Sequence, residues 1–73
     1  MEMQEDVPVR FGLRLRALRL DAELSQEQLA VKAGLHFTYI SQVERGKRNP
    51  TIVTLARIAS ALQVPLAVLV AFD

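Results

Sequence analysis

The chain has 73 residues, enough for one small domain but not for a catalytic domain beside a binding domain. Hydrophobic residues make up 51% of it, yet none of their runs is long enough to cross a bilayer, and the acidic start at residues 1–6 is unlike a secretory signal. There is no cysteine, so we expect a cytoplasmic protein without disulfides or thiolate metal sites.

Charge is unevenly distributed along the chain, although the formal net charge is only +1. Four of the acids lie at the two ends, which leaves the middle of the chain basic. The basic residues gather in two groups, Arg10, Arg14, Arg16 and Arg19, followed by Arg45, Lys47 and Arg48. This distribution predicts a basic patch on a nearly neutral protein, as expected for a nucleic-acid binder.

The first helix is expected to begin near Asp6 or Pro8, since an acid and a proline both suit a first turn. It should end within residues 21–23, and residues 1–7 are predicted to form a flexible acidic terminus. Its buried face is predicted from apolar residues at helical spacing, Phe11, Leu15 and Leu18.

The start of a second helix is strongly signalled at Ser25, whose side chain can cap it while Gln28 completes a capping box. Gly34 can adopt the left-handed conformation that ends a helix, so this helix should be short. A third helix is expected from about His36 to Arg45, closed by Gly46. Two short helices joined by a tight glycine turn are the signature of a helix-turn-helix motif.

The third helix is predicted to have two different faces. Ile40 and Val43 should point inward. The opposite face carries Phe37, Thr38, Ser41, Gln42 and Arg45. Thr, Ser, Gln and Arg are side chains that bond base edges in the major groove of DNA. The alternative is an ordinary solvated surface, but an exposed Phe37 without a partner argues against it.

Beyond the polar loop at residues 46–50, Thr51 can cap a fourth helix, and Pro65 can open a short fifth one. The expected apolar stripe of the fourth helix is Ile52, Leu55, Ile58, Ala59 and Leu62. The tail from residue 64 to residue 72 carries more apolar residues than one short helix can bury in its own monomer. We therefore expect a two-fold dimer interface there, rather than an apolar terminus without a partner. Its predicted residues are Leu66, Val68, Leu69, Val70 and Phe72.

Residues 24–30, 33–35 and 39–50 closely resemble the phage-repressor-like (Cro/C1-type, XRE) helix-turn-helix family, and the likeness extends over nearly everything from residue 11 to residue 69. The resemblance implies an all-α fold, a compact five-helix lambda-repressor-like domain over residues 8–73. Its second and third helices would form the helix-turn-helix, and its last helix would dimerise. The short chain looks most like the controller proteins of restriction-modification systems, although stand-alone regulators of other operons share the pattern.

The resemblance also implies roles for individual side chains. Gln26 would bond a phosphate at the start of the second helix. Arg19 and Glu44 would form a buried salt bridge between the first and third helices. The implied readout positions are His36, Phe37, Thr38 and Gln42. The side chains implied to hold the DNA backbone are Tyr39, Arg45, Lys47, Arg48 and Asn49.

Two positions depart from the family pattern. The family usually places Ser, Thr or Asp where this chain has His36, and histidine is a poorer helix cap. The position of Phe37 is usually polar and is often arginine in controller-like members. Phe37 can contact a thymine methyl group, wedge at the groove wall, or fold back into the core. A base preference of a relative therefore does not transfer to this position.

Together these features predict a dimeric, sequence-specific transcriptional regulator on palindromic double-stranded DNA, with RNA polymerase as a further partner if it activates. Its alternative is a protein-interaction adaptor that uses the same fold without reading DNA. We expect no enzyme, because the serines lack partners for nucleophilic catalysis and no glycine-rich phosphate loop is present. With one histidine and no cysteine, we also expect no metal or cofactor. We expect no small-molecule ligand and no membrane contact, because the chain has neither room for a ligand-sensing domain nor an apolar run that crosses a bilayer.

Overall fold

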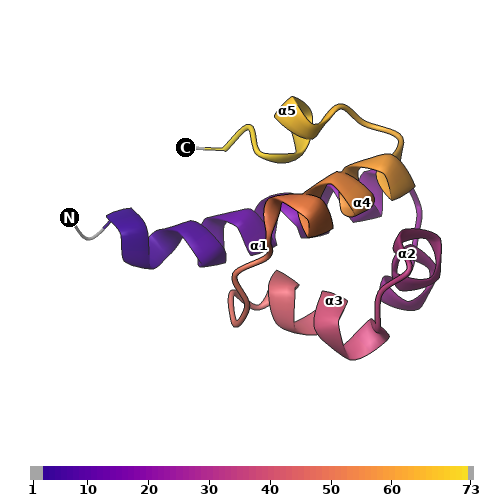
Figure 1. Cartoon of the computed structure of the whole chain (residues 1–73), viewed down its shortest axis with the longest axis horizontal. Helices are drawn as coiled ribbons and strands as arrows, with labels where there is room; N and C mark the ends of the chain where they lie inside the picture. The colour runs from indigo at the N-terminus through magenta and orange to yellow at the C-terminus, as the bar shows by residue number, and fades with distance from the viewer. Residues whose placement is uncertain (1–2, 73) are drawn as a thin grey trace.

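The computed structural model describes residues 3–72, with side chains from residue 6 onward, and shows an all-α fold as predicted (Figure 1). Its helices are α1 (Met3–Asp21), α2 (Gln26–Ala33), α3 (Phe37–Glu44), α4 (Ile52–Leu62) and α5 (Leu66–Leu69). The long α1 runs through the middle of the molecule, with α3 on one side of it and α5 on the other. No helix within residues 3–72 has both the length and the apolar character needed to cross a membrane.

The start of α1 differs from the expectation. The helix begins at Met3 rather than near Asp6 or Pro8, so Pro8 lies inside it. A proline there removes only one backbone hydrogen bond near the N-terminus of the helix. The acidic residues before it suit the positive end of the helix dipole. The expected helix start near Asp6 or Pro8 was therefore wrong. Of the terminus expected over residues 1–7, residues 1–2 lie outside the described residues.

The ends of α2 are fixed by local hydrogen bonds, as predicted. The Ser25 hydroxyl accepts from the Gln28 backbone N–H at 3.0 Å, and the Gln28 Oε1 accepts from the Ser25 N–H at 2.8 Å. Gly34 then ends the helix with a φ of +71°. Leu35 donates its N–H to the Ala30 carbonyl at 2.9 Å, which completes the tight turn into α3.

The ends of α3 and α4 are only partly as expected. Thr51 caps α4 by accepting from the Thr54 N–H at 3.2 Å, as expected. His36 occupies the N-cap of α3 without a side-chain cap bond, so the departure from the family pattern leaves this helix start uncapped. Gln63 ends α4 in the left-handed region with a φ of 59°, which no glycine signalled in advance.

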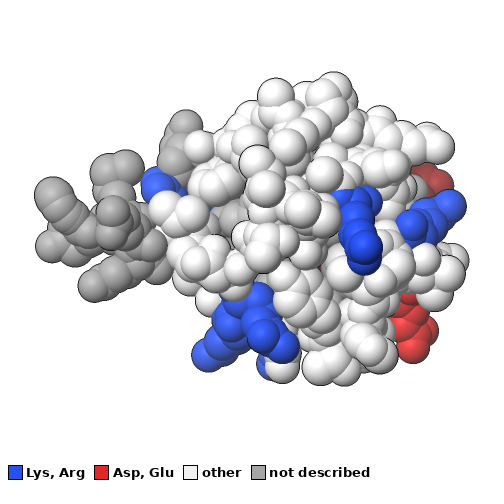
Figure 2. Space-filling view, viewed as in Figure 1, with Lys and Arg blue, Asp and Glu red and all other residues white. Residues whose placement is uncertain are grey.

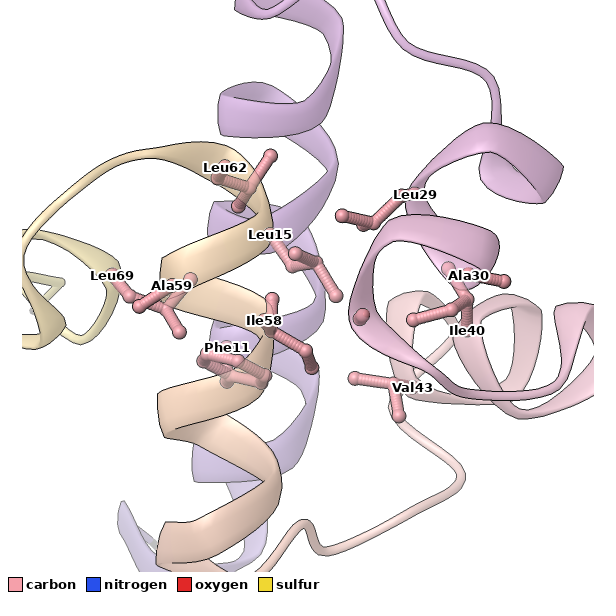
Figure 3. Packing of buried hydrophobic residues seen from close by; sticks show 11 residues of the cluster. Phe11, Leu15, Leu29, Ala30, Ile40, Val43, Ile58, Ala59, Leu62 and Leu69 are labelled. Atoms are coloured by element: carbon pink, nitrogen blue, oxygen red, sulfur yellow. The ribbon is translucent and has the colours of Figure 1, made fainter.

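All five helices contribute to one hydrophobic core (Figure 3). Its members are Phe11, Leu15, Leu29, Ala30, Ala33, Ile40, Val43, Ile58, Ala59, Leu62 and Leu69. Burial along α4 falls from Ile58, which is fully buried, through half-buried Leu55 to Ile52, which is 70% exposed. The prediction that Ile52 belongs to the buried stripe was wrong, because the first turn of α4 extends past the edge of the core.

Gly12 is a position where the backbones of α1 and α3 approach closely. A Cβ atom at this position would lie 2.5 Å from the Glu44 carbonyl oxygen and 2.6 Å from the Val43 carbonyl oxygen. The last turn of α3 therefore rests directly on the backbone of α1. This contact fixes how far α3 projects from the body of the domain.

Candidate nucleic-acid interface

The two faces of α3 are confirmed. Ile40 and Val43 are fully buried against the core, whereas the side chains predicted to face outward are all at least partly accessible. Of the outward set, Phe37, Thr38 and Arg45 are exposed, and Ser41 and Gln42 are half-buried. The helix thus offers a row of polar side chains with one aromatic ring at its start.

Phe37 is not a core residue. Its side chain is 46% exposed, in the first turn of α3. This rules out the alternative in which the ring folds back into the core. An exposed aromatic ring at the start of a polar helix face fits the remaining two alternatives, contact with a thymine methyl group or a wedge at the groove wall.

Beside α3 the surface is hollowed to a volume of about 480 Å³. The hollow is lined by Gly34, Leu35, His36, Thr38, Tyr39, Gln42, Arg48 and Thr54. Five of these are predicted site residues, brought together from the turn before α3, from α3 itself and from the loop after it. Thr54 is a lining residue that the sequence did not predict. Thr54 lies three residues after the capping Thr51, and this spacing could have drawn attention to it. The Oγ1 atoms of the two threonines are 3.2 Å apart.

Three of the predicted residues contact one another at this hollow. The Arg48 Nε donates a hydrogen bond to the Gln42 Oε1 at 2.8 Å. The guanidinium carbon of Arg48 also lies 5.3 Å from the centre of the Tyr39 ring, within the range of a cation–π contact. A predicted base-reading residue and two predicted backbone-holding residues therefore form a single connected group.

The Arg19–Glu44 ion pair is present and buried. Arg19 Nε lies 2.6 Å from Glu44 Oε2, and a second guanidinium nitrogen donates to Glu44 Oε1 at 3.1 Å. The remaining nitrogen of Arg19 donates to the Leu24 carbonyl at 2.8 Å. This two-point bridge joins α1 to the last turn of α3, and the bond to Leu24 ties both to the turn before α2.

Gln26 is held by the same carboxylate. Its Nε2 donates to Glu44 Oε1 at 3.0 Å, and the side chain is half-buried. We expected it to bond a phosphate. In the structure one of its N–H groups is used inside the protein, which fixes the side chain at the start of α2 and leaves its second N–H available.

The first predicted basic group does not form a patch. Arg14 donates from Nε and Nη2 to the Val68 carbonyl, at 3.1 and 2.8 Å, and Arg19 is buried in its ion pair. The guanidinium carbon of Arg10 lies 6.0 Å from the centre of the Phe72 ring. Only Arg16 of this group is exposed; Arg10 and Arg14 are half-buried and Arg19 is buried. The expectation that this first group contributes to the basic patch was therefore wrong, because Arg10, Arg14 and Arg19 contact the C-terminal segment and α3 instead.

The second basic group is exposed and adjoins α3. Arg45, Lys47 and Arg48 are all exposed, as is Asn49 beside them. Figure 2 shows Lys and Arg side chains gathered at the lower edge of the face drawn, where Figure 1 places the loop between α3 and α4. Positive charge thus lies at the C-terminal end of the helix that carries the polar row.

The predicted dimer residues divide into two sets. Leu69 is fully buried inside the monomer, so it cannot also face a partner. Phe72 is half-buried, with its ring centre 6.2 Å from that of Phe11. Val68 and Val70 are 36% and 40% exposed, and Leu66 is half-buried. The surface over α5 in Figure 2 is free of charged side chains on the face drawn.

Within the part of the chain that the structure describes, no cluster of three or more His, Cys, Asp or Glu side chains is arranged to hold a metal ion.

Comparison with known proteins agrees with this geometry. The helix-turn-helix family profile matches residues 15–69. Control protein C.MunI of a Mycoplasma species is 42% identical over 63 residues, which are 85% of this chain and 85% of that protein. Control protein C.BamHI of Bacillus amyloliquefaciens is 41% identical over 63 residues, 85% of this chain and 78% of that protein.

A solved structure shows the same arrangement. The restriction-modification controller protein C.AhdI from Aeromonas hydrophila matches this chain with a TM-score of 0.83 at 45% identity, over 85% of this chain and 94% of that one. Both the fold and the motif formed by α2 and α3 are thus those of a known class. The chain belongs to the helix-turn-helix family of the Cro/C1 type, and it is a DNA-binding transcriptional regulator and not an enzyme.

Proposed function

We propose that this regulator acts in the cytoplasm as a homodimer on a palindromic operator and controls the expression of a restriction-modification system, including its own gene. The observation that carries the DNA-reading part is the polar row of α3, placed between an exposed Phe37 and the basic loop at residues 45–49. The restriction-modification part is supported by the printed names of relatives that match most of this chain and most of their own length.

The dimer is supported by what remains exposed around α5. Val68 and Val70 present apolar surface that their own monomer leaves uncovered, next to the half-buried Leu66 and Phe72. One short reading helix also contacts too few base pairs for useful specificity, whereas two on a palindrome double the contacts. We place the half-sites about one helical turn apart. The bound dimer would repress by covering a promoter, or activate by contacting RNA polymerase beside it.

The DNA-reading proposal is tested by selecting binding sites from random DNA and measuring affinity against salt. Gln42→Ala should weaken binding to the selected site by roughly 1–3 kcal/mol and remove the preference at one base position. Lys47→Ala should weaken binding to all DNA sequences about equally. It should also reduce the magnitude of the slope of log affinity against log salt by about one, because one phosphate contact is lost.

Two results would contradict this proposal. If Gln42→Ala kept every base preference of the wild type, Gln42 would not be a reading residue. If the wild type selected no site and its binding did not change with salt, the adaptor function would be the correct one. The genes beside this one give an independent test, since neighbouring endonuclease and methyltransferase genes are expected for a controller protein.

The dimer is tested by Val70→Asp. Each change occurs twice in a two-fold interface, so two carboxylates would be buried in apolar surface. We expect the dissociation constant of the dimer to rise by about tenfold or more, measured by analytical ultracentrifugation at low concentration. Val31→Asp is the matched control, since Val31 is an exposed valine on α2 and should leave dimerisation unchanged. Phe72→Asp is less suitable, because it also removes the contact with Phe11.

A Val70→Asp variant that sediments as the wild-type dimer would exclude Val70 from the interface and contradict the dimer contact proposed here.

A further inference from the structure

The contact between Arg48 and Gln42 determines which atoms of Gln42 remain free. A guanidinium group has only donors, so the atom of Gln42 that meets Arg48 Nε at 2.8 Å must be the carboxamide oxygen. The carboxamide nitrogen, with its two N–H donors, then points away from Arg48. In the free protein Gln42 is therefore presented mainly as a hydrogen-bond donor.

The position of Arg48 is fixed from two sides. Its guanidinium carbon lies 5.3 Å from the centre of the Tyr39 ring, and Tyr39 stands one turn before Gln42 on α3. The loop that carries Arg48 is also attached to Gln42 itself, because the Gln42 carbonyl accepts the Lys47 N–H at 2.9 Å and the Arg45 N–H at 3.2 Å. Backbone and side-chain bonds thus hold Arg48 and Gln42 in a single arrangement.

The bases differ in how they fit such a donor. Guanine offers two acceptors on its major-groove edge, N7 and O6, whereas adenine offers one acceptor and one donor, so that Gln pairs with adenine through both its oxygen and its nitrogen. Arg48 already uses one of the two lone pairs of that oxygen and turns the oxygen toward its own guanidinium group. A glutamine held in this way is better matched to guanine than to adenine.

We propose that Arg48 is a specificity-determining residue that acts through Gln42. By holding the carboxamide oxygen, it directs the N–H groups of Gln42 to the groove and favours guanine over adenine at the base that Gln42 reads. The inference rests on the proposed DNA-reading function of α3. The bond to Gln42 uses only the Nε–H of Arg48 and leaves its other N–H groups for a phosphate. Arg48 can therefore contact the DNA backbone and position Gln42 at the same time.

The experiment compares Arg48→Ala with Lys47→Ala, two variants that each remove one positive charge from the same loop. Binding-site selection with wild type and Gln42→Ala first identifies the base position that Gln42 reads. Affinity is then measured at that position for guanine and for adenine with each variant. We expect the guanine-to-adenine affinity ratio to fall about tenfold in Arg48→Ala and to stay unchanged in Lys47→Ala.

Arg48→Lys adds a variant that keeps the charge. Because lysine lacks the planar guanidinium that stacks on Tyr39 and bonds Gln42, the ratio should fall here too, with a smaller loss of overall affinity. In the free protein, NMR should show the Arg48 Nε–H exchanging more slowly with solvent in the wild type than in Gln42→Ala.

The outcomes separate this inference from the proposed function. If Arg48→Ala weakens all sites equally and keeps the wild-type base preference, Arg48 is only a backbone contact and the inference fails while DNA reading stands. A wild-type preference for adenine at the Gln42 position would overturn the inference as well. If the wild type selects no site, the proposed function itself fails.

Discussion

Replacing Arg19 by methionine is expected to lower the free energy of unfolding by about 3–5 kcal/mol. The change leaves the Glu44 carboxylate buried with only the Gln26 amide as a hydrogen-bond donor, after both guanidinium bonds are lost. It also leaves the Leu24 carbonyl without the nitrogen that donates to it. A domain of this size has a total stability of roughly 4–11 kcal/mol, so the variant should lose a large part of it.

The measurement is urea denaturation followed by far-UV circular dichroism, with Arg19→Met/Glu44→Leu as the control. The double variant removes both charges and should recover most of the loss, because nothing charged then remains buried without a partner. If Arg19→Met lowered the free energy of unfolding by less than about 1 kcal/mol, the effect would be that of an exposed ion pair. This result would contradict the burial described for this bridge.

Gly12→Ala should also destabilise the domain, although helix propensity alone would predict the reverse. Alanine is favoured over glycine by about 1 kcal/mol inside a helix. Here, however, the new methyl group would lie 2.5 Å from one α3 carbonyl oxygen and 2.6 Å from another. These are backbone atoms that cannot rotate away, and overpacking of this kind costs typically about 1–3 kcal/mol or more. We expect a net loss, seen as a fall of roughly 5–10 °C in Tm.

Ala17→Gly is the matched control for Gly12→Ala. Ala17 is exposed on the same helix, so this change measures the propensity difference without any contact to α3. It should cost about 1 kcal/mol. Gly12→Ala should in addition weaken operator binding while the protein is still folded, because α3 must move outward to make room. A Tm equal to or above that of the wild type would show that α1 and α3 are not in direct backbone contact.

The features that the sequence predicts well are local ones. The capping box at Ser25 and Gln28, the left-handed Gly34 and the Thr51 cap each involve residues a few positions apart, so the pattern itself contains both partners. The inward and outward faces of α3 follow from helical spacing in the same way. The Arg19–Glu44 bridge is confirmed too, but family resemblance predicted it, since its partners are 25 positions apart.

The features that the sequence missed depend on residues distant in the chain. Arg14 was grouped with a basic patch, yet its partner is a carbonyl 54 positions away. Leu69 was counted with its neighbours in the tail, and only the packing of α5 on α1 and α4 shows that it is core. Gly12 gave no signal, because a glycine required by a close approach looks in sequence like any other glycine in a helix. Residue spacing along one helix predicts which face is apolar, but not which other segment of the chain packs against that face.

The place of α1 has a consequence for the operator. It packs against α3, which carries the reading side chains, and against α5, where we place the dimer contact (Figure 1). One unbroken helix of 19 residues therefore connects these two surfaces. In the proposed dimer the distance from each α3 to the dimer contact is then set by helix packing across α1 rather than by a flexible loop. Such a protein distinguishes operators by the distance between their halves as well as by their bases.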